Sequence, residues 1–352
     1  MSDIRVALAD DSSFLRKAVA RMLAGEPGIE LVGSAARGEE LLENLDRWRP
    51  DAVILDLSMP GIGGLATLDG IMARRPVPVI ILSTYSRKGA PQTIEALHRG
   101  AVDFVDKQQF SLVDFDALRQ ALAGKIREVT AGRRDAKPAA EPAKRAPLEE
   151  GEAPDVVLIG ASTGGPPAIE RILRDVGGDV PVPILVVQHM PAGFTRAFAE
   201  RLNIQLPLEV REPVDGEPLR PGTVYIARGG FHLRIASSRE RLVAAVSSDP
   251  ENTPHRPSVD VLFASAVEVG VHAVAILLTG MGQDGAEGMA RLAARGALTI
   301  AQDEATSTIF GMPRAAAAIG GVREMLPLPE IGARLRRLWT ASEAAAVEME
   351  SL

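Results

Sequence analysis

The sequence predicts an α/β protein made of two doubly wound parallel-sheet domains, and three observations lead to that fold class. Short aliphatic runs alternate with longer segments whose apolar residues recur every three or four positions, which is the helical period. Such alternation of strands and helices is typical of parallel sheets covered by helices on both faces. The chain also has 352 residues, more than one hydrophobic core usually organises, so we expect two domains.

The composition narrows the class of protein. Of the residues, 46% are hydrophobic and 24% are charged, which is typical of a globular protein. The net charge of −7 argues against a nucleic-acid-binding protein. No apolar run approaches membrane-spanning length and no secretory signal is recognisable, so we expect a cytoplasmic protein without direct membrane insertion. The absence of cysteine excludes disulfides, thiolate metal sites and a cysteine nucleophile.

A segment rich in alanine, proline and charged residues divides the two predicted domains. It spans residues 131–155 and has no apolar periodicity, which indicates a solvated, extended linker. We therefore expect a first domain over residues 1–127, a flexible linker over residues 128–154 and a second domain over residues 155–352.

Each aliphatic run is expected to form a strand of one of the two sheets. In the first domain the expected strands are residues 4–9, 29–35, 51–57, 77–83 and 102–107, with helices such as residues 13–25 between them. In the second domain they are residues 156–160, 182–189, 223–227, 271–280 and 297–301. In doubly wound sheets ligands bind beyond the carboxyl ends of the strands, so functional residues should directly follow these runs.

Polar residues stand at the ends of four expected strands in the first domain. They are Asp10 and Asp11 after the first strand, Asp56 at the third, Ser83 at the fourth and Lys107 at the fifth. Three carboxylates at one sheet edge repel each other unless a hard divalent cation lies between them, and Mg²⁺ suits such a site. Lys107 would add a positive charge for a phosphoryl group, and Ser83 would add a hydroxyl donor.

These residues, within motifs such as DLSMPGIGG and DFVDK, resemble the receiver domain of two-component response regulators. The resemblance covers residues 3 to about 125 and implies a flavodoxin-like fold. It implies that Asp56 accepts a phosphoryl group from a histidine kinase. It also implies that Asp11, Asp56 and the Ser58 carbonyl hold Mg²⁺, with Asp10 acting through a water molecule.

The same resemblance implies a switch that reports phosphorylation. Ser83 and Phe104 would form the switch pair, and Lys107 would contact the phosphoryl group. The sequence departs from the family at Gln108, where the family usually has a proline after the lysine. The turn that this proline makes in the family is therefore not expected here.

The second domain begins with the stretch VVLIGASTGGPPAIERIL, residues 156–173, which places three glycines around Ser162 and Thr163 between a strand and a helix. One interpretation is a phosphate loop for a dinucleotide. That fold usually has an acidic residue near the end of its second strand, but Asp179 precedes the strand at 182–189. Short-chain dehydrogenases, which have a similar glycine-rich opening, also need a tyrosine followed by a lysine four residues later. Both tyrosines of this chain have glycine there, which disfavours the dinucleotide interpretation.

The other interpretation is a serine nucleophile. Residues 160–164 fit the pattern G-x-S-x-G in the required strand-turn-helix context. The small neighbours would permit a strained turn that exposes the Ser162 hydroxyl, and the helix beyond it offers N–H groups. The alternative is that Ser162 merely caps the helix expected at residues 166–173.

A serine nucleophile needs a base, and His189 is the best placed of the five histidines. It directly follows the apolar strand PILVVQ, whereas the other histidines occupy different settings. His98 lies on a receiver helix, His232 in the loop after residues 223–227, His255 in the segment TPHRPSVD, and His272 at the start of a buried strand.

The base in turn needs an acid that orients and stabilises it. Asp284 lies in a glycine-rich loop after the strand expected at 271–280, so it also lies at a strand end. Asp260 is the rival, but its sequence context indicates the start of a helix. We therefore expect a triad of Ser162, His189 and Asp284 in that chain order.

The second domain resembles the chemotaxis protein-glutamate methylesterases, which are regulated by a receiver domain. The motifs that carry the resemblance are GASTGGPPAI, QHMPAGFT, HRPSVDVLF, LTGMGQDGA and QDEATSTIFGMPRAA. The resemblance covers about residues 155 to 345, and Arg228 is a departure at a position where the family commonly has proline. It implies a Rossmann-like catalytic domain without a cofactor. The oxyanion would need backbone N–H donors, for which Met281 and Thr163 are the candidates.

The resemblance also implies the reaction, the partners and the regulation. The substrates would be glutamyl methyl esters on the cytoplasmic helices of chemoreceptors, with deamidation of glutamines as a second acyl transfer. A chemotaxis histidine kinase would be the phosphodonor. From the two-domain layout and the linker between the domains, we also expect the unphosphorylated receiver to cover the mouth of the esterase cleft. Two alternatives remain open: a second domain that only binds a partner, and a DNA-binding regulator, although no basic helix-turn-helix follows the linker.

Overall fold

Two separate parallel β-sheets organise the chain, one in each half of the sequence, as the alternating pattern predicts. The computed structural model describes residues 3–83, 89–107, 115–131, 154–239, 241–250 and 252–350. By its internal contacts the chain divides into two units, Met1–Ala136 and Lys137–Leu352. Gln108 and residues 132–153 of the expected linker lie outside the described residues.

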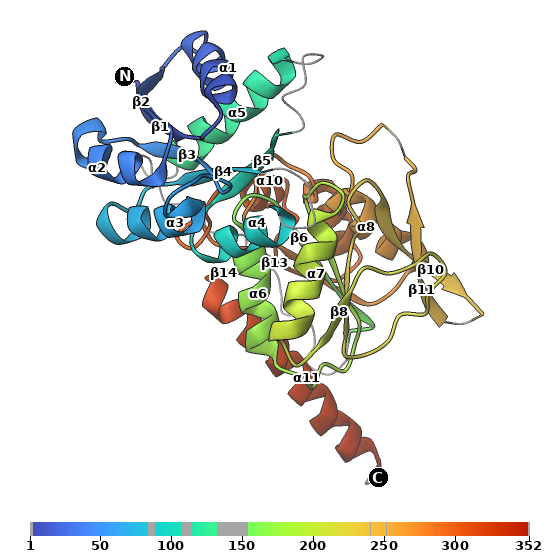
Figure 1. Ribbon diagram of the computed structural model, residues 1–352. Helices are drawn as coiled ribbons and strands as arrows, with labels where there is room; N and C mark the ends of the chain where they lie inside the picture. Colours follow the sequence, from blue (N-terminus) through green and yellow to red (C-terminus); the bar gives the residue numbers. More distant parts are fainter. Residues whose placement is uncertain are drawn as a thin grey trace. The chain divides into compact units, whose positions relative to one another are not determined.

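The first unit contains a five-stranded sheet with the order β2-β1-β3-β4-β5 (Figure 1). Its strands are β1 (Ile4–Ala9), β2 (Ile29–Ala35), β3 (Ala52–Asp56), β4 (Val79–Ser83) and β5 (Asp103–Asp106). All neighbouring strands are parallel, and each lies within the run expected from the sequence. This strand order is the flavodoxin-like one.

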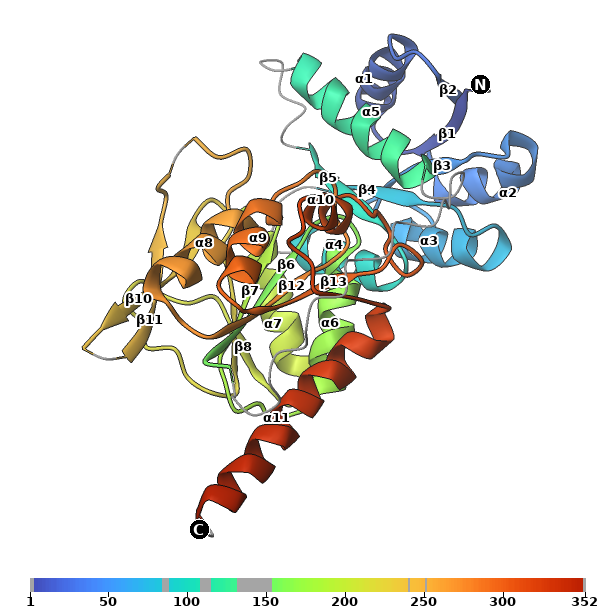
Figure 2. The same ribbon diagram turned by 180° about the vertical axis from the view of Figure 1, so that it is seen from behind.

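Helices cover both faces of this sheet. They are α1 (Ser13–Ala24), α2 (Gly38–Trp48), α3 (Gly63–Arg74), α4 (Gly89–His98) and α5 (Phe115–Ala131). Helices α1 and α5 lie on one face and α2, α3 and α4 on the other (Figures 1 and 2). As a result every residue of β3 and β4 is buried. Helix α5 continues to Ala131, into residues expected for the linker.

The second unit contains a seven-stranded parallel sheet with the order β14-β13-β12-β6-β7-β9-β8. Its strands are β6 (Val156–Ala161), β7 (Ile184–Gln188), β8 (Glu209–Arg211), β9 (Thr223–Ile226), β12 (Ala273–Leu277), β13 (Leu298–Gln302) and β14 (Glu324–Leu326). The doubly wound fold class predicted for this half is therefore confirmed. The short edge strands β8 and β14 were not expected, because three residues are too few to leave a periodic pattern.

Six helices cover this second sheet in the described residues. They are α6 (Gly165–Val176), α7 (Phe194–Gln205), α8 (Val259–Val269), α9 (Ala286–Ala294), α10 (Met312–Ala318) and α11 (Leu328–Glu350). Helices α6, α7 and α11 lie on one face, and α8, α9 and α10 lie on the other (Figures 1 and 2). Among the residues that the structure describes, no helix is long and apolar enough to cross a membrane.

An antiparallel hairpin interrupts the parallel pattern and corrects one expectation. Strands β10 (His232–Ser238) and β11 (Arg241–Ser247) pair with each other and form a separate two-stranded sheet beside α8. The sequence placed His232 in a loop, but it is the first residue of β10 and fully buried. Polar and apolar residues alternate from His232 to Ile235, a strand signal that sequence reasoning missed.

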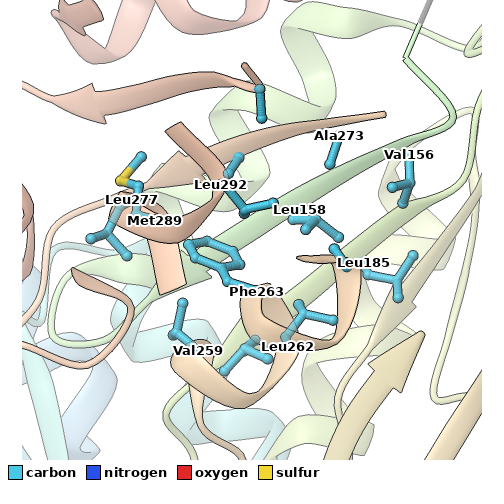
Figure 3. Packing of buried hydrophobic residues seen from close by; sticks show 14 of the residues in the cluster. Val156, Leu158, Leu185, Val259, Leu262, Phe263, Ala273, Leu277, Met289 and Leu292 are labelled. Carbon is cyan, nitrogen blue, oxygen red and sulfur yellow. The ribbon is translucent and has the colours of Figure 1, made fainter. Parts of the chain in front are cut away.

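The core beneath helices α8 and α9 positions the loops at the carboxyl edge of the sheet. Phe263 and Leu262 from α8 pack with Met289 and Leu292 from α9 over strand residues such as Leu158 (Figure 3). These side chains are at most 2% exposed. Because α8 is fixed by this core, its N-terminus is fixed too, and that terminus meets the functional loops described below.

Replacing Phe263 with alanine should destabilise the second unit by about 3–5 kcal/mol, because it leaves a cavity beneath α8. Ile204→Ala is the matched control, since Ile204 is 84% exposed, and should change the unfolding free energy by less than about 0.5 kcal/mol. Urea unfolding in a Trp48→Phe background, which leaves Trp339 as the one tryptophan of the chain, measures the second unit. Equal midpoints for the two variants would contradict the assignment of Phe263 to the supporting core.

Candidate active site

The carboxyl ends of β6, β7 and β12 bring the three predicted triad residues together. From β6 the chain builds the sheet outward through β7 and β9, then returns to the other side of β6 to start β12. This reversal beside β6 is a switch point, the place where doubly wound sheets bind their ligands. Ser162 directly follows β6, His189 directly follows β7, and Asp284 lies in the loop after β12.

Strand register sets Ser162 and His189 side by side. Ala161 pairs with Gln188, and each predicted residue is the next one along its strand. The His189 N–H donates to the Ala161 carbonyl at 3.0 Å, which extends the ladder by one bond. On the other side of β6, the Ser162 N–H donates to the Thr279 carbonyl at 3.0 Å. The serine backbone is thus held between the loops of both neighbouring strands.

The turn after Ser162 has a different geometry from the strained one that the sequence suggested. Among the described residues other than glycine, only Arg49 and Arg239 have a positive φ, so Ser162 does not. The left-handed residue is Gly164, with φ at 77°, and a Cβ there would lie 2.3 Å from the Thr308 hydroxyl. Glycine tolerates the positive φ and leaves room for Thr308. The turn therefore forms without a positive φ at Ser162.

Ser162 does not cap the helix that follows it. Helix α6 begins at Gly165, its N-cap is Gly164, and no side chain caps it. The Gly165 N–H instead donates to the Ser162 backbone carbonyl at 2.8 Å. The capping interpretation of this serine is therefore wrong, and its hydroxyl remains available for another role.

Gln188 holds the same carbonyl from the β7 side. Its side chain is buried, and Nε2 donates to the Ser162 carbonyl at 2.8 Å. A Cβ at Gly165 would lie 2.0 Å from the Gln188 Oε1, so this glycine makes room for the glutamine. Sequence reasoning missed Gln188, although its place at the end of a strand, directly before His189, was a usable signal.

A buried threonine ties the remaining loops to the Ser162 turn. The Thr279 hydroxyl donates to the Thr163 carbonyl at 2.9 Å and accepts from the Ile309 N–H at 2.9 Å. Its own N–H donates to the Gln302 Oε1 at 2.9 Å. Gln302 and Ile309 belong to the sequence motif at residues 302–316. Part of that motif therefore supports the turn that carries Ser162.

The two expected oxyanion donors lie in the turns that meet at Ser162. Thr163 follows the serine and is 4% exposed, while the half-buried Met281 follows Gly280. A Cβ at Gly280 would lie 2.8 Å from the Ser162 Cβ, so the backbone of that loop touches the serine. The structure thus brings both segments to the serine.

Asp284 binds His189 and is itself held at the N-terminus of α8. Its Oδ2 lies 2.7 Å from the His189 Nε2 and accepts from the Val259 N–H at 2.7 Å. Its Oδ1 accepts from the Ser258 hydroxyl at 2.8 Å and the Asp260 N–H at 3.1 Å. Helix N-termini stabilise anions in this way because several N–H groups converge there.

These donors keep Asp284 ionised despite its burial. Burial by itself raises the pKa of this carboxyl group. The hydrogen bond and charge of His189, with the donors from Val259 and Ser258, outweigh burial and hold the pKa of Asp284 well below its usual range. The rival Asp260 lies in the first turn of α8, where its Oδ1 accepts from the Gly288 N–H at 2.7 Å. His189 therefore contacts Asp284 and not its rival.

The tautomer of His189 follows from this contact. An ionised Asp284 can only accept, so the proton of a neutral imidazole lies on Nε2. The other ring nitrogen, Nδ1, is buried and has no hydrogen-bond partner within the described part of the chain. Its lone pair is therefore free to take a proton, which is the property that a general base requires.

Two histidines that the sequence assigned no role lie next to this pair. The ring of His255 stacks on the ring of His189, with centroids 4.1 Å apart and planes inclined by 19°. The buried His232 accepts from the Ser258 N–H through Nδ1 at 3.2 Å, and its Nε2 lies 3.1 Å from the Pro250 carbonyl. Burial is the largest effect and lowers the pKa of His232, so this ring is neutral with its proton on Nε2.

The first unit places its acidic residues at its own switch point, between β1 and β3. Carboxylate oxygens of Asp10, Asp11 and Asp56 all lie within 4.8 Å of one another. The Lys107 ammonium lies 2.9 Å from Asp10 and 2.6 Å from Asp56. Burial raises the pKa of Asp10 against the lowering effect of Lys107. Two buried carboxylates and the exposed Asp11, clustered this closely, fit a hard divalent cation. The Ser58 N–H donates to Asp56 Oδ1 at 3.0 Å, which keeps that loop beside the carboxylate.

The two expected switch residues lie on neighbouring strands. Phe104, on β5, is 8% exposed and pairs with Ile81 of β4. The Ser83 hydroxyl lies 2.5 Å from the Thr93 hydroxyl, which in turn donates to the Gly89 carbonyl at 2.8 Å. Because Thr93 uses its proton on that carbonyl, Ser83 is the donor in the short contact. Thr93, on α4, was not singled out by the sequence.

Comparison with known families agrees with both halves of the chain. The family model described as CheB methylesterase matches residues 157–335, and the one described as response regulator receiver domain matches residues 6–123. The chain belongs to the CheB methylesterase family and carries a receiver domain. This confirms the resemblance that the motifs indicated.

Relatives and solved structures extend this family match over the whole chain. A relative from Symbiobacterium thermophilum is 41% identical and aligns over 95% of this chain and 96% of its own length. One from Archaeoglobus fulgidus is 40% identical over 95% of this chain and 97% of its own length. Both are named protein-glutamate methylesterase/protein-glutamine glutaminase. The crystal structure of the Thermotoga maritima CheB methylesterase catalytic domain aligns with a TM-score of 0.51 at 37% identity, covering 53% of this chain and all of that one.

The buried His232 predicts how stability depends on pH in this CheB-family chain. Its pKa is lowered from 6.5 in the folded state, so as the pH falls below about 6.5 the unfolded chain binds this proton first. The stability present above that pH is therefore lost as the pH falls toward the lowered pKa. His232→Gln, which cannot titrate, should lose less unfolding free energy between pH 7.5 and 5.5 than the wild type in urea unfolding.

His272→Gln is the matched control, because it makes the same substitution in the same unit, directly before β12. The pH dependence of the unfolding free energy should fall further below that of the wild type in His232→Gln than in this control. The same loss of stability in His232→Gln and wild type would contradict the neutral, buried state assigned to His232.

Proposed function

We propose that this chain is a phosphorylation-regulated serine hydrolase that removes methyl esters from glutamates on the cytoplasmic helices of chemoreceptors. Deamidation of receptor glutamines would be a second reaction of the same site. One observation carries the proposal: the ionised Asp284 holds His189 beside the Ser162 turn at the switch point of a CheB-family sheet. The proposed domains are a receiver over residues 1–127, a linker over 128–154 and a catalytic domain over 155–352.

The proposed mechanism follows from the protonation states of the three residues. His189 takes the hydroxyl proton of Ser162 through Nδ1, and the serine oxygen attacks the ester carbonyl carbon. The intermediate then collapses, the C–O bond to the methoxy group breaks, and methanol leaves with the proton from His189. A water molecule repeats the sequence on the acyl-enzyme and releases the glutamate. Asp284 stays ionised throughout and stabilises the imidazolium.

The developing oxyanion needs donors that are already in place. The backbone amides of Thr163 and Met281 are proposed for this role, because their segments meet at Ser162. Losing one such donor costs roughly 2.7–4 kcal/mol of transition-state stabilisation in comparable sites. The support of these turns by Gln188 and Thr279 is consistent with the rigidity that an oxyanion hole requires.

A catalytic role is favoured over the alternative of a second domain that only binds a partner. A binding module gains nothing from burying a carboxylate and supplying it with several hydrogen-bond donors beside a histidine. The relatives are also named as enzymes. A partner-binding domain would retain its biological output when Ser162 is replaced, whereas an esterase would not.

In the receiver, Asp56 is the proposed acceptor of a phosphoryl group from a chemotaxis histidine kinase. Asp11, Asp56 and the Ser58 carbonyl, with Asp10 acting through a water molecule, would hold a Mg²⁺ ion that neutralises charge during the transfer. Lys107 already pairs with Asp10 and Asp56, so it lies where a phosphoryl oxygen would need a positive charge. Phosphorylation would then raise the population of an active form of the enzyme.

Methanol release from membranes that contain methylated chemoreceptors, with and without a small phosphodonor and Mg²⁺, tests the proposed activity. Ser162→Ala should reduce release to background. Asp284→Asn should lower kcat on the order of 10⁴-fold, because an amide cannot hold the His189 tautomer.

Asp179→Asn is the matched control for the acidic residue, since Asp179 is exposed and lies outside the site, and it should retain wild-type turnover. Release that does not depend on Ser162, or none from the wild type with phosphodonor, would reject the proposed reaction.

The contact between Ser83 and Thr93 predicts the behaviour of the receiver switch. If Ser83 must leave Thr93 to donate to the phosphoryl group, this hydrogen bond stabilises the unphosphorylated form by about 1 kcal/mol. Thr93→Val should therefore raise methanol release without phosphodonor up to about fivefold. Thr93→Ser retains the hydroxyl and serves as the control. Unstimulated activity that is equal in the two variants would show that Thr93 does not restrain Ser83.

A further inference from the structure

One histidine outside the proposed triad lies directly on the proposed base. The His255 ring stacks on the His189 ring with a centroid distance of 4.1 Å and nearly parallel planes. The two side chains differ in environment, since the His189 side chain is 8% exposed and His255 is an exposed residue. His255 therefore covers a face of the catalytic imidazole from the solvent side.

The segment that carries His255 is held at both ends. Before it, the Thr253 hydroxyl donates to the His255 carbonyl at 2.9 Å and lies 3.1 Å from the Nε2 of the buried His232. After it, the Ser258 hydroxyl donates to Asp284. The loop at the start of β10 adds a further anchor, because the Gly230 N–H donates to the Arg256 carbonyl at 3.1 Å. The ring of His255 is thus carried on a fixed backbone.

His189 needs such a contact because its ring has one polar anchor. Nε2 binds Asp284, but Nδ1 has no hydrogen-bond partner in the described residues. A ring held at one atom can still tilt about that bond, and the tilt changes the direction in which Nδ1 points. A second aromatic ring stacked on its face limits this tilt.

We propose that His255 is a positioning residue for His189, which keeps the plane of the catalytic imidazole in register with Ser162 through ring stacking. The inference rests on the proposed esterase function and adds a residue to its machinery. Its role requires a flat aromatic ring and does not require the ring nitrogens of His255. That distinction separates it from a role in which His255 transfers a proton or donates a hydrogen bond to the substrate.

The test compares His255→Ala with His255→Phe in the full-length protein, using methanol release from methylated receptor membranes with saturating phosphodonor and Mg²⁺. His255→Ala should lower kcat about 10- to 100-fold with KM within about twofold, because the base is misplaced after substrate binds. His255→Phe should restore kcat to within about threefold of the wild type. His272→Ala, at the amino end of β12, is the matched control and should leave both constants unchanged.

Three outcomes would overturn the proposal. The first is a His255→Phe variant as slow as His255→Ala, which would assign the role to a ring nitrogen. The second is a change confined to KM, which would make His255 a substrate contact. The third is a His255→Ala variant with wild-type kcat.

A second readout does not depend on activity. The ring-proton resonances of His189 in NMR spectra should move in His255→Ala, as the ring current of its neighbour is lost, and stay nearer the wild type in His255→Phe. If the wild-type enzyme releases no methanol, the proposed esterase function is rejected, whatever the NMR comparison shows. The NMR comparison then still decides whether His255 orders the His189 ring, and unchanged resonances in His255→Ala would reject the stacking.

Discussion

The site of the second unit depends on one buried carboxylate at the N-terminus of a helix. Asp284 engages four groups, namely the N–H groups of Val259 and Asp260, the Ser258 hydroxyl and the His189 ring. Burial of a charge is costly unless donors surround it, and here α8 provides most of them. The contact also joins the loop after β12 to the start of α8 and to the loop after β7. The position of the His189 imidazole therefore depends on how α8 packs on the sheet.

The same feature of sheet topology places the polar residues of both units, although the chemistry of the two sites differs. In each sheet the chain reverses its direction of growth beside a central strand, at β1 and β3 in the first unit and at β6 and β12 in the second. Polar side chains at the carboxyl ends of such a pair lie where doubly wound sheets bind their ligands. The first unit uses this edge for three carboxylates and Lys107. The second uses it for a serine, a histidine and an aspartate.

Polar side chains buried beneath the second site explain how its glycine-rich loops stay ordered. Gln188, Thr279 and Gln302 are all at most 2% exposed, and each binds the backbone of a loop from another strand. Such contacts replace the regular ladder, which ends where the strands end. Glycine is required at positions 164 and 165 because a side chain at Gly164 would collide with Thr308 and one at Gly165 with Gln188. The turn therefore holds Ser162 without a positive φ at the serine itself.

The sequence by itself determined the two parallel sheets, their main strands and the residues at the strand ends. Hydrophobic periodicity is a local property. The rule that ligands bind beyond the carboxyl ends of the strands then selects Asp10, Asp56, Ser162 and His189 without coordinates. Only the tertiary structure decided that His255 covers His189, that His232 is buried in a hairpin, and that Gln188 and Thr93 hold their neighbours. These contacts join residues from separate loops and elements, and no short pattern in the chain encodes them. Which side chains meet there depends on how α8 and the hairpin pack, and packing is a property of the whole fold.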